Sequence, residues 1–178
     1  MKRATNFVIV DPSLRSTGVL VFNGINIHHY AIQASKKVGR LKILGNYSKH
    51  FTELAQSNNW DFLAIENYTF KQHKSSAVTV QAEVGGIIRG CFAAEGVPII
   101  EANCQTWKAV TGIRLPKGTK ADNSNYIYAV AKKYDFICQT TDECDTYLMW
   151  QTLKAISRGK TSKGTELKKT MLEMGVEV

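Results

Sequence analysis

Four acidic residues occur at positions from which a folded α/β chain could bring them together. Asp11 follows the apolar run FVIV, and Glu66 ends the run DFLAIE. Asp142 and Asp145 are three residues apart in TDECDTYLMW, a spacing that places both side chains on one face of a helix. Sites in α/β folds form where strands end and helices begin. We therefore expect Asp11, Glu66, Asp142 and Asp145 to share one site.

Four carboxylates in one site repel each other, and this repulsion raises their pKa values unless cations are bound. Mg²⁺ removes the conflict because it prefers oxygen ligands. Two such ions about 4 Å apart can activate a water and stabilise the leaving oxygen in phosphodiester cleavage. We therefore predict a site with two Mg²⁺ ions, for which Mn²⁺ can substitute, and phosphodiester hydrolysis as its chemistry.

Each acid also has a structural interpretation when it is considered alone. Asp11 precedes a proline and could cap a turn, and Glu66 could be an exposed strand end. Asp142 would suit the positive end of a helix dipole. The charge of the whole chain favours the functional interpretation, because a formal net charge of +8 and a pI of about 9.3 indicate a polyanionic partner.

The apolar patterns predict the order β-β-β-α-β-α-β-α-α-α, which is an α/β domain with a mixed sheet covered by helices. The sequence Thr140-Thr-Asp-Glu143 matches a capping box, so we expect a helix to begin there with Asp142 in its first turn. The predicted strands are 7–10, 19–22, 25–31, 61–66 and 97–102, and the predicted helices are 40–58, 77–95, 104–111, 121–134 and one from 140.

A chain of 178 residues is sufficient for one domain with a buried core. No apolar run reaches membrane-spanning length, and the N-terminus lacks the apolar segment of a signal peptide, so we expect an intracellular, cytoplasmic protein. The four cysteines, Cys91, Cys104, Cys138 and Cys144, show no CxxC or Cys/His spacing, and we expect free thiols.

Three motifs, VDPSLRSTG, AIENY and TDECDTYLMW, resemble those of the RuvC family of Holliday-junction resolvases, and the resemblance spans residues 6–158. It implies an RNase H-like fold, with a five-stranded mixed sheet and helices on both faces. It also implies that Asp11, Glu66, Asp142 and Asp145 are the metal ligands and catalytic acids of a homodimer that resolves four-way or branched DNA junctions. We expect a nuclease domain at 1–158 and a basic, partly helical C-terminal tail at 159–178.

The same resemblance suggests further DNA contacts. Phe70 follows the second acid, where the family has an aromatic residue that touches bases near the crossover. Lys108 in QTWK, and Lys117 or Lys120 in PKGTK, resemble basic residues that hold phosphates near the active site. Arg15 in the first turn could also reach DNA, while Lys117 and Lys120 would equally suit a solvated loop.

One departure from the family pattern is Ser13, because the family usually has glycine after the Asp-Pro pair. Such divergence suits a viral or mobile-element resolvase. Two alternatives remain: another RNase H-like nuclease that acts on RNA–DNA hybrids or structured RNA, and a non-catalytic junction-binding protein. A phosphate-transfer ATPase is disfavoured, because that fold needs a second glycine-rich loop and an adenosine site, for which the chain is too short.

Overall fold

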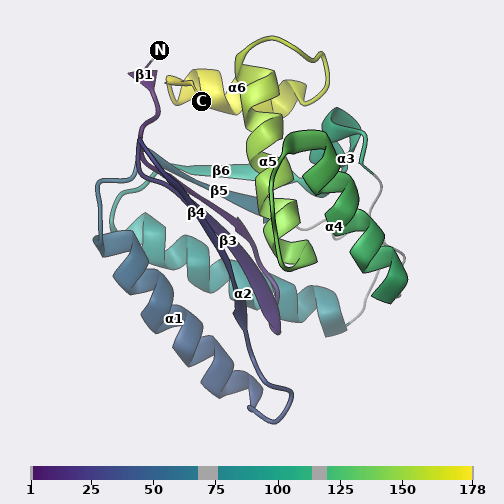
Figure 1. Ribbon diagram of the computed structural model, residues 1–178. Helices are drawn as coiled ribbons and strands as arrows, with labels where there is room; N and C mark the ends of the chain where they lie inside the picture. Colours follow the sequence, from purple (N-terminus) through teal and green to yellow (C-terminus); the bar gives the residue numbers. More distant parts are fainter. Residues whose placement is uncertain (1, 68–75, 114–119, 178) are drawn as a thin grey trace.

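A five-stranded sheet forms the centre of the computed structural model, which describes residues 2–67, 76–113 and 120–177. Its strand order is β4-β3-β2-β5-β6 (Figure 1). The strands β2, β5 and β6 are parallel, and β3 and β4 continue the sheet in antiparallel fashion, so the sheet is mixed. The strand bounds are β2 (Phe7–Asp11), β3 (Ser16–Phe22), β4 (Ile27–Gln33), β5 (Phe62–Asn67) and β6 (Ile99–Asn103).

Helices cover both faces of this sheet, as the sequence predicts. The pair α1 and α2 lies on one face, while α5 lies across the other with α3, α4 and α6 around it (Figure 1). The helix bounds are α1 (Arg40–Gln56), α2 (Ser76–Ala94), α3 (Cys104–Thr111), α4 (Lys120–Tyr134), α5 (Thr141–Ser157) and α6 (Thr165–Glu173). In the described part of the chain, no helix is long and apolar enough to cross a membrane.

The alternation of side chains along β2 explains why its run is apolar throughout. Val8 and Val10 belong to the core between the sheet and the helices α1 and α2, whereas Phe7 and Ile9 belong to the core beneath α5. A central strand that is covered on both faces has no solvated side, so every position before Asp11 is hydrophobic.

The C-terminal segment packs onto the same domain. Leu167 and Met171 of α6 are buried in the core beneath α5, together with Val176. The short strand β7 (Val176–Glu177) pairs in parallel with β1 (Lys2–Arg3). The two ends of the chain therefore lie side by side, beyond the N-terminal end of β2 (Figure 1).

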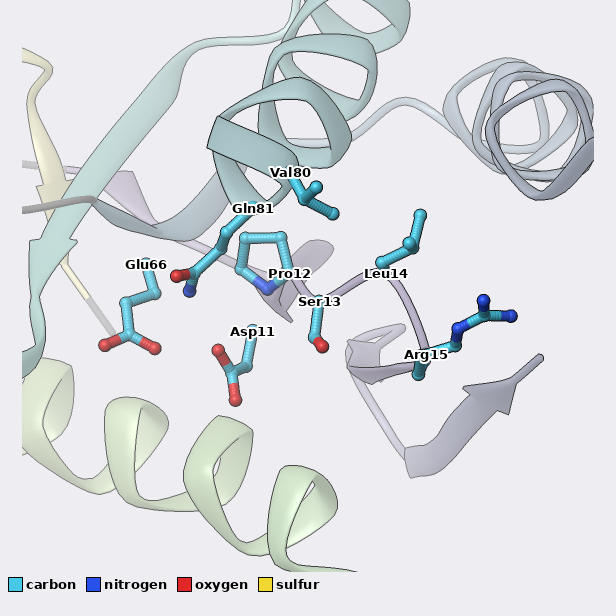
Figure 2. Close-up of a pocket in the computed structure, with 8 residues that line it drawn as sticks. All are labelled: Asp11, Pro12, Ser13, Leu14, Arg15, Glu66, Val80 and Gln81. Carbon is cyan, nitrogen blue, oxygen red and sulfur yellow. The ribbon is translucent and has the colours of Figure 1, made fainter. Parts of the chain in front are cut away.

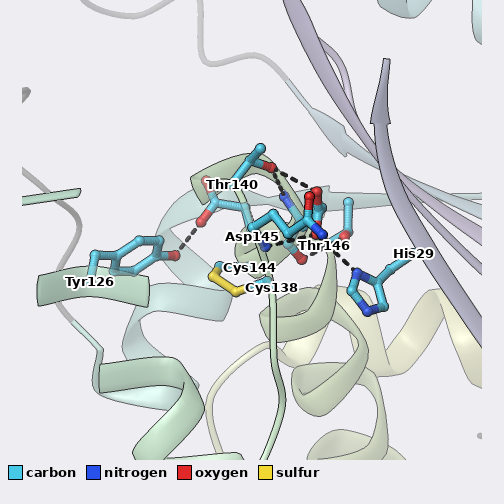
Figure 3. Close-up of a disulfide and its surroundings, with 9 residues drawn as sticks. His29, Tyr126, Cys138, Thr140, Cys144, Asp145 and Thr146 are labelled. Carbon is cyan, nitrogen blue, oxygen red and sulfur yellow. Dashed lines mark hydrogen bonds and ion pairs between the residues drawn. A yellow bond between two sulfur atoms is a disulfide. The ribbon is translucent and has the colours of Figure 1, made fainter. Parts of the chain in front are cut away.

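The structure corrects the expectation that all cysteines are free thiols. Cys138 and Cys144 form a disulfide, with Cα atoms 6.0 Å apart, which joins the loop after α4 to the first turn of α5 (Figure 3). Asp135 ends α4 with a positive φ of 52°, and the chain then turns back towards α5. The spacing of six residues between Cys138 and Cys144 did not indicate in the sequence that the two cysteines pair. Cys91 and Cys104 are free.

Candidate active site

The sheet register places Asp11 and Glu66 side by side. Val10 pairs with Ile65 on the neighbouring parallel strand, so Asp11 and Glu66 are the next residues on both strands. Side chains alternate along a strand, and Ile9, two positions before Asp11, faces α5. Ala64 has the same relation to Glu66. Both carboxylates therefore project from the α5 face of the sheet, and Figure 2 shows them pointing into the same space.

The helix α5 supplies the other two acids, and Thr140 is its N-cap, as the sequence predicts, although the Glu143 side chain reaches the residue before the cap. The Thr140 hydroxyl accepts a hydrogen bond from the Glu143 backbone N–H at 3.2 Å. The Glu143 carboxylate in turn accepts one from the Gln139 backbone N–H at 3.0 Å. The first bond satisfies a donor that a helix start would otherwise leave unpaired, and the second ties the residue before the N-cap to the first turn. They begin α5 at a point that puts Asp142 in its first turn and Asp145 one turn later.

The position of α5 depends on a glycine in β3. Gly18 pairs with Asp11 across the antiparallel hairpin. A Cβ atom at residue 18 would lie only 2.3 Å from the backbone oxygen of Asp142. The absence of a side chain at Gly18 thus allows the first turn of α5 to approach the sheet next to Asp11. The Ser16 hydroxyl donates a 2.5 Å hydrogen bond to the Asp142 carboxylate at the same contact.

The four acids stand in an environment that penalises their charged forms. Burial, and then the charges of Glu66 and Asp142, raise the pKa of Asp11 well above its usual value. Burial raises the pKa of Glu66 to about 7. Burial and the charge of Asp11 raise the pKa of Asp145 well above normal, and burial also raises that of Asp142. The cluster is an electrostatic conflict that bound cations would relieve.

Lys108 is a cation that lies near these acids. Its ammonium lowers the pKa values of both Asp11 and Asp145, in opposition to burial. The Lys108 Nζ atom also lies 2.6 Å from the Cys104 sulfur, one turn earlier in α3. Cys104 is half-buried and contributes to the raised pKa of Glu66. The first turn of α3 therefore closes the site beside Glu66.

The donor set fits divalent metal in type, because four carboxylates supply the hard oxygen ligands that Mg²⁺ takes. Within residues 2–67, 76–113 and 120–177, no group of three or more His, Cys, Asp or Glu side chains is arranged to hold an ion as the side chains lie. Two hydroxyls are hydrogen-bonded to these carboxylates. Tyr126 of α4 donates a hydrogen bond to the Asp145 carboxylate (Figure 3), and Ser16 donates to Asp142.

The raised pKa values predict a stability change with pH in metal-free protein. Between about pH 4.5 and about pH 7 the folded state holds more protons than the unfolded state at Glu66, so the free energy of unfolding should fall as pH rises through this window. Glu66→Gln should remove this part of the pH dependence and stabilise metal-free protein at pH 8 by on the order of 1 to 3 kcal/mol. Urea unfolding with a chelator at pH 5 and pH 8 measures both effects. A Glu66→Gln variant that is less stable than wild type at pH 8 would show that the charged Glu66 carboxylate does not destabilise the metal-free protein.

A cleft of about 360 Å³ opens from the carboxylates along the first turn (Figure 2). Its lining residues are Asp11, Pro12, Ser13, Leu14, Arg15, Glu66, Val80 and Gln81. Ser13 fits this turn, because its N–H donates to the Thr17 hydroxyl and its carbonyl accepts from that hydroxyl. Asp135 is the non-glycine residue with positive φ in the described ranges, so the turn does not require a glycine at position 13.

The structure places the other predicted residues in different ways. Arg15 lies at the end of the cleft, where its guanidinium donates to backbone carbonyls. Lys120 is the exposed first residue of α4. Phe70 and Lys117 lie outside the described residues. Tyr126 was missed, because its only sequence signal is an aromatic residue at a spacing that also suits core packing.

Comparisons with known proteins were made for both sequence and structure. No protein-family model and no curated protein sequence matches the chain. RuvC of Thermus thermophilus in complex with a Holliday junction substrate is similar in structure, with a TM-score of 0.62, 15% identity, and coverage of 88% of this chain and 98% of that one. A further Thermus thermophilus RuvC structure gives a TM-score of 0.59 at 15% identity and the same coverage.

The Holliday junction resolvase of fowlpox virus matches more weakly, with a TM-score of 0.45, 13% identity, and coverage of 83% of this chain and 96% of that one. The two RuvC matches include nearly the whole domain, and the sheet order and the helices on both faces agree with the fold implied by the three sequence motifs. The protein therefore has the RNase H-like fold of RuvC.

Proposed function

We propose that the protein is a metal-dependent, structure-selective endonuclease that resolves four-way or branched DNA junctions by phosphodiester hydrolysis. The observation that carries this proposal is the convergence of Asp11 and Glu66 at the strand ends with Asp142 and Asp145 at the start of α5. Burial of four neighbouring carboxylates lowers the stability of a folded protein. Metal-dependent nuclease chemistry on a RuvC-type fold would explain why the chain nevertheless carries them. The similar Thermus thermophilus RuvC is described in complex with a Holliday junction substrate.

The four carboxylates would hold two Mg²⁺ or Mn²⁺ ions. When bound, these ions would activate a water and neutralise charge as the phosphodiester breaks. The hydroxyls of Tyr126 and Ser16 restrict how the Asp145 and Asp142 carboxylates turn, as partners of metal ligands commonly do. The Lys108 ammonium stands beside Asp11 and would offset the negative charge of the scissile phosphate.

A four-way junction presents pairs of equivalent strands, and a homodimer with one site per subunit matches that symmetry. Each subunit would nick one of two strands of like polarity. Junction binding should weaken steeply with salt, because Lys and Arg contacts to phosphates release counterions. The basic net charge of +8 supports this expectation.

A cleavage panel tests the proposal and separates it from the alternatives. Purified protein is incubated with a four-way junction, a flap, a linear duplex and an RNA–DNA hybrid, first with a chelator and then with added Mg²⁺ or Mn²⁺. We expect metal-dependent cutting of the junction and little cutting of the duplex. Preference for the hybrid would favour the other RNase H-like nucleases, and binding without cutting under all metal conditions would favour a junction-binding protein.

A further inference from the structure

One segment of the chain, which begins directly after Asp11, carries only positive formal charge. Between Asp11 and Glu53 the sequence contains no acidic residue, and residues 12–52 carry six Lys and Arg side chains against a net charge of +8 for the whole protein. These basic residues are Arg15, Lys36, Lys37, Arg40, Lys42 and Lys49. The segment folds as β3, β4, the connection after β4 and most of α1. A basic surface therefore adjoins the acidic site along the chain.

Arg15 joins the turn that follows Asp11, residues 12–15, to the connection between β4 and α1, residues 34–39, which we call the basic turn. Its Nη1 atom donates hydrogen bonds to the backbone carbonyls of Ser35, at 2.7 Å, and Val38, at 3.1 Å. Its own carbonyl accepts one from the Ala34 backbone N–H at 2.9 Å. The guanidinium is thus used to hold the basic turn, and it points away from Asp11 (Figure 2).

Two lysines of the basic turn are exposed and available for a ligand. Lys36 and Lys37 both lie at the surface, and neither has an ion pair among those found in the described part of the chain. Arg40 and Lys49 of the same segment differ in this respect, because Arg40 is paired with Glu83 of α2 and Lys49 with Glu53. Charge on Lys36 and Lys37 is therefore not offset by a nearby carboxylate.

The cleft runs from the acids to Arg15, the residue that holds the basic turn. Its lining begins at Asp11 and Glu66 and ends at Arg15, which is bonded directly to the basic turn. A backbone that entered the cleft at the carboxylates and left it past Arg15 would meet Lys36 and Lys37. Lysine side chains on such a path suit phosphates, because each ammonium neutralises one charge without reading a base.

We propose that the basic turn, held by Arg15, is a second DNA contact, which binds backbone phosphates of the junction arm that leaves the cleft. Arg15 is a positioning residue in this scheme, and Lys36 and Lys37 contact the DNA. The inference rests on the proposed nuclease function and adds to it a defined path for the arm. It assigns the affinity for DNA to residues outside the carboxylate site.

The test measures junction binding in a Glu66→Gln background, so that cutting does not disturb the measurement. Lys36→Ala/Lys37→Ala is compared with Lys168→Ala/Lys169→Ala, a second pair of adjacent exposed lysines, on α6 at the opposite end of the sheet (Figure 1), of which Lys169 forms a 3.8 Å ion pair with Glu173. The first pair should weaken binding about 10-fold at 0.1 M salt and lower the slope of log K against log salt by about 2. The second pair should change neither quantity.

Arg15→Ala separates positioning from direct contact. As a single variant, Arg15→Ala should weaken junction binding. In the Lys36→Ala/Lys37→Ala background it should cause little further loss, because Arg15 acts through the turn that carries these lysines. Full additivity in the triple variant would overturn the role of Arg15. Equal affinity and salt slope for the Lys36→Ala/Lys37→Ala variant and its parent would overturn the second contact, while the nuclease proposal would stand. A parent that binds no DNA would overturn both.

Discussion

Glu66→Gln is expected to lower the rate of junction cleavage by at least about 10³-fold, with junction affinity within about threefold of wild type. The reason is that Gln keeps the size of the side chain but removes a charged ligand from the site, where metal supplies most of the stabilisation of the transition state. Single-turnover cleavage of a labelled junction measures the rate, and a gel shift measures the affinity.

Glu53→Gln is the matched control, since Glu53 is an exposed glutamate on α1, remote from the carboxylate cluster, with a 4.0 Å ion pair to Lys49. Its cleavage rate should equal that of wild type. Circular dichroism of both variants would check that the fold is retained. Cleavage at the wild-type rate by Glu66→Gln would exclude the carboxylate cluster as the catalytic centre.

Gly18→Ala is expected to have the second largest effect, although residue 18 carries no functional group. The new methyl would lie 2.3 Å from the Asp142 backbone oxygen, and neither backbone can yield without moving β3 or α5. We expect a loss of about 2 kcal/mol in the free energy of unfolding, typical of overpacking. Displacement of Asp142 and Asp145 by a fraction of an ångström should also lower the cleavage rate about 10²-fold.

Gly86→Ala provides the contrast, because a Cβ built at that exposed position of α2 meets nothing within 4 Å in the described part of the chain beyond its own helix backbone and chain neighbours. Alanine there should stabilise the helix by roughly 0.5 to 1 kcal/mol. Denaturant unfolding of both variants, together with junction cleavage, tests the contact. Gly18→Ala with unchanged stability and rate would show that α5 is not held against β3 in this way.

The fold could be predicted because the patterns that specify its strands and helices lie within short stretches of the sequence. The run before Asp11 is apolar at every position, which indicates a strand covered on both faces, and the capping box at Thr140 fixes where α5 begins. The two parallel strands that end in Asp11 and Glu66 also place the carboxylates at one edge of the sheet without any knowledge of tertiary contacts.

Several parts of the site could not be predicted, because they depend on contacts between segments that are distant in sequence. The need for a glycine at position 18 arises from α5, more than 120 residues later. Tyr126 reaches Asp145 because α4 packs beside α5, and nothing in its local pattern separates that role from core packing. Arg15 was expected to reach DNA, whereas in the structure its guanidinium is bonded to two carbonyls.

The most direct test of the central claim is strand-resolved mapping of cleavage on a synthetic four-way junction in Mg²⁺, with each strand labelled in turn. We predict paired nicks at symmetric positions on two strands of like polarity, which disappear with a chelator and with Glu66→Gln. A linear duplex of the same sequence should remain uncut. Absence of junction cleavage in Mg²⁺ and Mn²⁺, or nicks that persist in Glu66→Gln, would contradict the assignment of Asp11, Glu66, Asp142 and Asp145 as the catalytic site of a junction nuclease.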